Sequence, residues 1–79
     1  MTKRAFILIE TEGGDSKNVG CRLKELEGVK TANVVTGPYD VIVEVELDNL
    51  NDLGIVLIDR IPYIRGISRM VTCLTMVGC

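Results

Sequence analysis

Hydrophobic and polar residues follow alternating strand and helix periods along the chain. Residues 4–11 are apolar almost throughout, which is typical of a strand buried on both faces. In 17–27, apolar residues recur at helical spacing and share one face. Residues 29–36 return to a strand pattern, and residues 40–47 alternate strictly between apolar and polar positions. This half of the chain therefore predicts two strands after a first strand and helix.

The second half of the pattern predicts one more helix and one more strand. Asp48 or Asn49 can cap the helix by accepting a bond from a free backbone N–H. Four apolar residues line up on its inner face: Leu50, Leu53, Leu57 and Ile61. Pro62 lacks an N–H and ends or kinks this helix, and a last strand follows over 67–77.

The resulting order, βαββαβ, predicts a ferredoxin-like α+β sandwich with both helices on one face of a four-stranded antiparallel sheet. Gly28 ends the first helix, and Asp15 or Ser16 begins it. The short connection Gly37-Pro38-Tyr39-Asp40 predicts an antiparallel hairpin. We expect residues 1–79 to form this single domain, since the chain is too short for two.

Two helices leave one face of such a sheet uncovered. The strands over 4–11 and 67–77 carry Ile, Leu, Val or Met on both faces, so the uncovered face is apolar. A core of this size supplies only about 3–5 kcal/mol, so an oligomer is expected. The pattern predicts a dimeric α/β barrel joined sheet to sheet, with Glu44 and Glu46 at its rim or paired with Arg or Lys.

Composition limits the chemistry. The chain has no histidine, so the usual proton shuttle and the commonest metal ligand are missing. We expect no enzyme activity, no metal and no cofactor. The net charge of −2 disfavours direct binding to nucleic acid. A small enzyme with a polar pocket between the two sheets remains an alternative, as does a pure assembly module without a ligand.

The cysteines and the apolar runs indicate a compartment. Three cysteines without a CxxC motif predict neither a disulfide framework nor a zinc site. We expect two buried thiols, Cys21 and Cys73, and an exposed Cys79 in a reducing cytoplasm, with no role assigned to any of them. The apolar run near the N-terminus stops at Glu10, too soon for a signal peptide. No stretch is long enough to span a membrane.

The segment 34–42 contains more than a turn requires. Backbone N–H groups around Gly37 can meet an anionic group, while Asp40 can meet a cationic one a few ångströms away. Such a pair suits a zwitterion such as a free amino acid. An ordinary turn, in which Asp40 bonds to its own loop, explains the same residues.

Two segments together resemble a known family. Thr36-Gly37-Pro38-Tyr39-Asp40 after a Val-rich strand, and the last strand from Gly66 to Leu74, look like the effector domain of Lrp/AsnC regulators, also called the RAM domain. The resemblance covers essentially the whole chain. It implies sheet-to-sheet dimers that assemble into rings of four, with effector sites between dimers near the hairpin, commonly for amino acids.

Carried over by position, the resemblance places Gly37, Tyr39 and Asp40 in the effector site, with Thr72 on the last strand as a further candidate. Full-length regulators of this family have an N-terminal helix-turn-helix, whereas here the first strand begins by residue 4. The resemblance therefore implies a stand-alone domain that binds no DNA itself and acts on transcription through a partner such as a full-length regulator.

Overall fold

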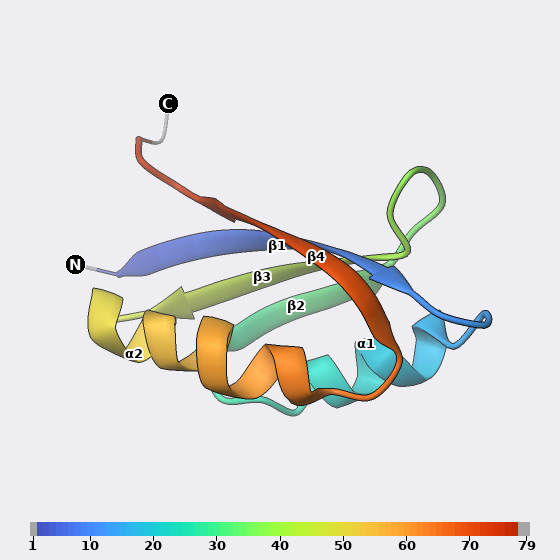
Figure 1. The fold of residues 1–79 in the computed structure, drawn as a ribbon. Coiled ribbons are helices and arrows are strands. Elements are labelled where there is room, and N and C mark those ends of the chain that lie inside the picture. The colour runs from blue at the N-terminus through green and yellow to red at the C-terminus, as the bar shows by residue number, and fades with distance from the viewer. Residues whose placement is uncertain (1, 78–79) are drawn as a thin grey trace.

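The chain folds into two layers, a twisted sheet with two helices on one of its faces (Figure 1). The computed structural model describes residues 2–77. The first half contains β1 (Lys3–Thr11), α1 (Ser16–Lys24) and β2 (Val29–Val34). The second half contains β3 (Val41–Leu47), α2 (Leu50–Ile55), the π-helix η1 (Val56–Arg60), the 3₁₀ turn η2 (Ile61–Tyr63) and β4 (Ile67–Leu74). The predicted ferredoxin-like α+β fold is confirmed.

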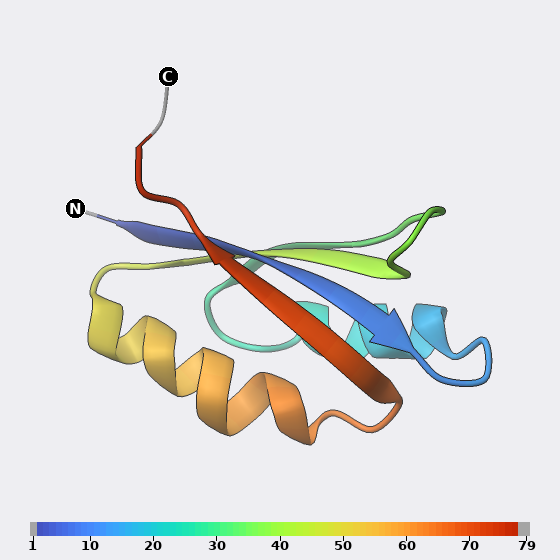
Figure 2. The ribbon, with the colours of Figure 1, turned by 45° about the horizontal axis from the view of Figure 1, so that its top comes forward.

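All neighbouring strands are antiparallel, in the order β2-β3-β1-β4. The central strand β1 pairs with β3 on one side, with Ile9 opposite Val41, and with β4 on the other, with Ile9 opposite Met70. The first and last strands of the chain are therefore neighbours. Figure 2 shows α1 and α2 beneath the same face of this sheet.

The core lies between the sheet and the helices. Alternate residues of β1 and β3 point into it, as the period-2 pattern predicted for β3. No polar side chain is buried among residues 2–77. The fully buried side chains of the two strands and α1 are Ala5, Ile7, Ile9, Val41, Val43, Val45, Val19 and Leu23.

The second helix differs from the prediction. Leu50, expected on the inner face, is 58% exposed, whereas Leu53, Val56 and Ile61 are buried. Leu50 is the first residue of α2 and lies before the π-helix η1, whose wider turn brings residues five apart onto one face from Val56 onward. Ile61 therefore follows Val56 into the core, and Arg60 stays exposed. Asn49 is the cap, and its side chain accepts from the backbone N–H of Asp52 at 2.8 Å.

Several element ends also differ from the prediction. α1 ends at Lys24 rather than at residue 27, because Leu26 N–H bonds to Leu23 C=O in a tighter turn. β2 ends at Val34, so the hairpin loop is longer than expected and spans 35–40. β4 ends at Leu74 rather than at residue 77.

The sheet face opposite the helices, which we call the open face, is apolar at its centre. This apolar centre consists of Phe6, Leu8, Ile42 and Val71. Leu8 of β1 lies opposite Ile42 of β3 and Val71 of β4, and Phe6 lies two residues before Leu8 on the same face of β1. Ion pairs flank this patch: Arg4 Nη1 lies 3.6 Å from Glu44 Oε2, and Lys30 Nζ lies 3.3 Å from Glu46 Oε2. The prediction that these glutamates pair with basic residues is confirmed.

The prediction of two buried thiols is wrong. Cys73 is exposed because it lies on the open face, where it pairs with Phe6. Cys21 is exposed because it lies on the solvent side of α1, two residues from each of the buried Val19 and Leu23. Cys79 lies outside the described residues.

Candidate functional site

The loop 35–40 between β2 and β3 extends beyond the sheet, away from the helices (Figure 1). It is closed by a hydrogen bond from Val35 N–H to Asp40 C=O at 2.9 Å. Gly37 has φ +128°, a region that other residues rarely adopt, and no atom lies within 4 Å of the position its Cβ would take. The backbone at Gly37 is thus open to a neighbouring molecule.

Asp40 joins this loop to the end of β1. Its backbone N–H donates to Ile9 C=O at 2.8 Å. Its carboxylate Oδ2 accepts from Thr11 N–H at 2.8 Å and from Thr11 Oγ1 at 3.2 Å. Both side-chain bonds use one oxygen, so the other oxygen of this half-buried carboxylate has no protein donor among residues 2–77.

Thr11 was missed by the sequence reasoning. It lies 29 residues from Asp40 in the chain, and nothing in the local pattern links the two. Only the order β3-β1 in the sheet places the end of one strand beside the start of the other. A polar residue at the end of an otherwise apolar strand was the available signal.

The predicted site residues fall into two places. Gly37, Tyr39 and Asp40 lie together in the loop, with Tyr39 half-buried and Gly37 exposed. Thr72 lies on β4, opposite Ile7, with β1 between it and β3. Two strand spacings, on the order of 10 Å, separate Thr72 from β3. Within one protomer Thr72 is not part of the loop site.

The ends of the strands around the loop carry charge. Glu10 of β1 and Arg69 of β4 form an ion pair, with Arg69 Nη1 3.7 Å from Glu10 Oε2. Ser68 Oγ donates to Glu10 C=O at 3.1 Å. These exposed bonds fix β4 against the end of β1, and Asp40 fixes the loop on the other side of the same strand.

Within residues 2–77, no three His, Cys, Asp or Glu side chains are grouped so as to hold a metal ion. No helix in this range is both long enough and apolar enough to cross a bilayer.

Comparison with protein families identifies the class. Residues 4–77 match the model of the Lrp/AsnC ligand binding domain. The chain therefore belongs to the Lrp/AsnC ligand-binding domain family, as its hairpin and last strand indicated.

Curated relatives are transcriptional regulators. The uncharacterized HTH-type transcriptional regulator PH1916 of Pyrococcus horikoshii is 30% identical over 76 residues, which are 92% of this chain and 51% of that protein. A second one, PYRAB16920 of Pyrococcus abyssi, is 30% identical over 71 residues, or 86% of this chain and 47% of that protein. The chain spans about half the length of the curated relatives it matches.

Solved structures have the same fold. Hypothetical protein PHS023 from Pyrococcus horikoshii has a TM-score of 0.88 at 36% identity, with 99% of this chain and 93% of that chain covered. AsnC of E. coli has a TM-score of 0.86 at 26% identity, with 96% of this chain and 52% of that chain covered.

Proposed function

We propose that this domain binds a free amino acid as an effector and acts on transcription through its assembly with other proteins. The observation that carries the proposal is the family match over residues 4–77. The loop 35–40 supports it, because the backbone at Gly37 is accessible and only one carboxylate oxygen of Asp40 is hydrogen-bonded to Thr11.

The two groups of the loop suit opposite ends of a zwitterion. Backbone N–H groups around Gly37 meet the α-carboxylate, and the free oxygen of Asp40 meets the α-ammonium group. The bonds from Thr11 to the other oxygen hold Asp40 in place before the effector arrives. One solved structure with this fold, a transcriptional regulator of Neisseria meningitidis at 14% identity and a TM-score of 0.79, is a complex with L-Met.

Assembly completes the site in this proposal. Two copies join through the open face, and dimers meet near the loop 35–40, where Tyr39 contributes to the contact. Thr72 reaches an effector only from a neighbouring protomer, since β1 separates it from the loop within its own. The assembly forms rings of four dimers, or combines with a full-length Lrp/AsnC regulator, in the cytoplasm.

The domain itself neither binds DNA nor catalyses a reaction in this proposal. With a net charge of −2 it offers little attraction to phosphate. An enzyme on this fold needs polar groups enclosed between the sheets, whereas the centre of the open face, which would line that space, consists of the apolar Phe6, Leu8, Ile42 and Val71. A gel-shift experiment at low salt should show no retardation by residues 1–79.

A thermal-shift screen with each of the twenty amino acids identifies the effector, because a ligand that binds only the native state raises the Tm. Asp40→Asn should then weaken the best amino acid by about 10- to 150-fold, as expected for the loss of a charge-assisted hydrogen bond. Asn still accepts from Thr11, so fold and assembly should be unchanged.

Asp48→Asn is the matched control, because it removes the same charge at the other, exposed end of β3. Calorimetry on the three proteins decides the result. Equal affinity for Asp40→Asn and wild type would remove Asp40 from the site and leave it the role of ordering the loop. A protein that binds none of the twenty amino acids would favour an assembly module.

A further inference from the structure

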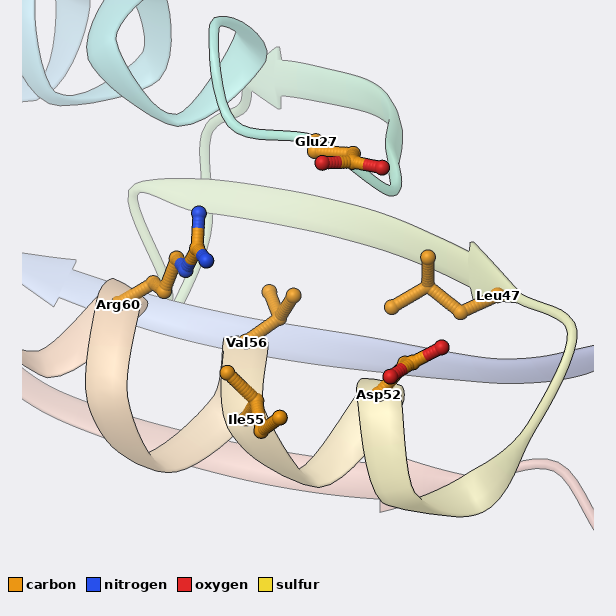
Figure 3. Close-up of a pocket in the computed structure, with 6 residues that line it drawn as sticks. All are labelled: Glu27, Leu47, Asp52, Ile55, Val56 and Arg60. Atoms are coloured by element: carbon orange, nitrogen blue, oxygen red, sulfur yellow. The ribbon is translucent and has the colours of Figure 1, made fainter.

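A cavity lies far from the loop 35–40, between α2 and the end of β3 (Figure 3). Its volume is about 180 Å³, below the roughly 300–1,000 Å³ of sites for drug-sized ligands. We call it the α2 cavity and define it by its lining residues, Glu27, Leu47, Asp52, Ile55, Val56 and Arg60.

The floor of the α2 cavity is apolar and its rim is charged. Leu47 and Val56 lie at the bottom, between the helix and the sheet (Figure 3). Arg60 reaches into the space from one end, Asp52 lies at the opposite end, and Glu27 faces the helix from the turn before β2 (Figure 3). Opposite charges thus stand at the two ends of an apolar surface.

These charged groups do not form ion pairs with one another. Every ion pair within 4.0 Å among residues 2–77 lies elsewhere, on Arg4, Lys30 and Arg69. The guanidinium of Arg60 therefore lies more than 4.0 Å from the carboxylates of Glu27 and Asp52. Two carboxylates against one guanidinium leave the rim with a net charge of −1, so its electrostatic complement carries a net charge of +1.

The local structure holds both ends of the cavity in position. The π-helix η1 places Ile61 in the core and leaves Arg60, one residue earlier, at the cavity rim. Asp52 is oriented by Asn49, whose side-chain amide donates to Asp52 Oδ2 at 2.9 Å and whose oxygen accepts from Asp52 N–H. The carboxylate of Asp52 is therefore preorganised, which lowers the entropic cost of binding.

We propose that the α2 cavity is a second ligand site, independent of the loop 35–40, that binds a free basic amino acid. The α-carboxylate bonds to Arg60, the ammonium groups bond to Glu27 and Asp52, and the methylene chain lies on Leu47 and Val56. Such a ligand matches the −1 rim, the apolar floor and the small volume together.

L-Lysine, norleucine and 1,5-diaminopentane test the ligand chemistry, because norleucine lacks the distal ammonium group and the diamine lacks the carboxylate. Calorimetry should show binding of lysine that is at least tenfold tighter than that of either analogue. NMR should show lysine-dependent shifts of the Leu47 and Val56 methyl groups. No binding of lysine, or equal binding of norleucine or the diamine, would overturn the proposal.

Two substitutions test the residues. Arg60→Gln and Asp52→Asn should each weaken lysine about tenfold, and both positions are exposed, so the fold should persist. Asp59→Asn is the control, because it removes a neighbouring charge outside the cavity and should leave the affinity within twofold. Unchanged affinity in Arg60→Gln would also overturn the proposal.

The variant Asp40→Asn distinguishes the loop site from the α2 cavity experimentally, because it should leave lysine binding at the α2 cavity unchanged. Lysine-dependent shifts confined to residues 35–40 would reject the α2 cavity while supporting the loop. These measurements therefore distinguish a failure of the proposed loop site from a failure of the proposed site in the α2 cavity.

Discussion

At the scale of single residues, two glycines do more than turn the chain. Gly28 has φ +89°, and a Cβ there would lie 2.8 Å from Leu47 Cγ. Gly66 has φ +102°, and a Cβ there would lie 2.8 Å from Val19 Cγ2. The sequence predicts a break at Gly28, since Gly commonly follows the end of a helix, but it does not predict the close packing at either glycine. That packing depends on side chains from distant elements.

Gly28→Ala should therefore destabilise the protein more than Gly13→Ala. Both residues have positive φ, which costs a side chain about 1–2 kcal/mol, but no atom lies within 4 Å of a Cβ at Gly13. The clash with Leu47 should add about 1–3 kcal/mol to the loss of unfolding free energy. Urea denaturation of the two variants measures the difference, and equal losses would show that Leu47 moves aside freely.

At the scale of elements, the strands were predictable and the second helix was not. Strict alternation in β3 determines which side chains face the helices, and in the structure the predicted residues of β3 face the core. In the second helix, the spacing of Leu50, Leu53, Leu57 and Ile61 fits a regular α-helix, so the pattern gave no indication of a π turn. The π turn brings Val56 and Ile61, five residues apart, into the core together.

The candidate site was predictable to the same degree. Gly37 and Asp40 are visible as an unusual turn, because local residues determine turns. The bond from Thr11 to Asp40 and the separation of Thr72 from the loop follow from strand order, which no local pattern contains.

Ile61, which directly follows the π-helix, is a core residue, and its contribution to stability can be measured. Ile61 is fully buried and Ile58 is 69% exposed, although both are isoleucines of the same helical segment. Ile61→Ala should cost about 2–5 kcal/mol of unfolding free energy, as deletions in a core do. Ile58→Ala should change it by less than about 0.5 kcal/mol. Similar losses for the two variants would contradict the burial of Ile61.

At the scale of the whole molecule, the sheet has one covered and one open face. The molecule is a slab whose shortest principal extent is 17 Å, which leaves room for only one layer of helices. The apolar centre of the open face, with ion pairs at Arg4 and Lys30 beside it, has the arrangement of an interface core and its polar rim. The sequence predicted this imbalance because β1 is apolar on both faces.

Leu8→Glu should convert the proposed dimer into a monomer, because it places a charge at the centre of the open face. At micromolar concentration wild-type protein should scatter light as a dimer of about twice 8.7 kDa or as a multiple of that dimer, and Leu8→Glu as 8.7 kDa. Ile58→Glu adds the same charge to an exposed position on the helix layer and should stay dimeric. Circular dichroism verifies that both variants fold, and a monomeric wild type would contradict the dimer.

The strand order has a consequence for the folding pathway. β2 and β3 are joined by a short loop and can pair early, whereas β1 and β4 come from opposite ends of the chain. Pairing Ile9 with Met70 closes a loop of roughly sixty residues, whose entropic cost grows with the logarithm of its length. The central strand β1, which precedes the other strands in this domain, thus receives its second neighbour only after β4 has been made. Until then β1 has an unpaired, strongly apolar edge, which makes the nascent chain prone to aggregation.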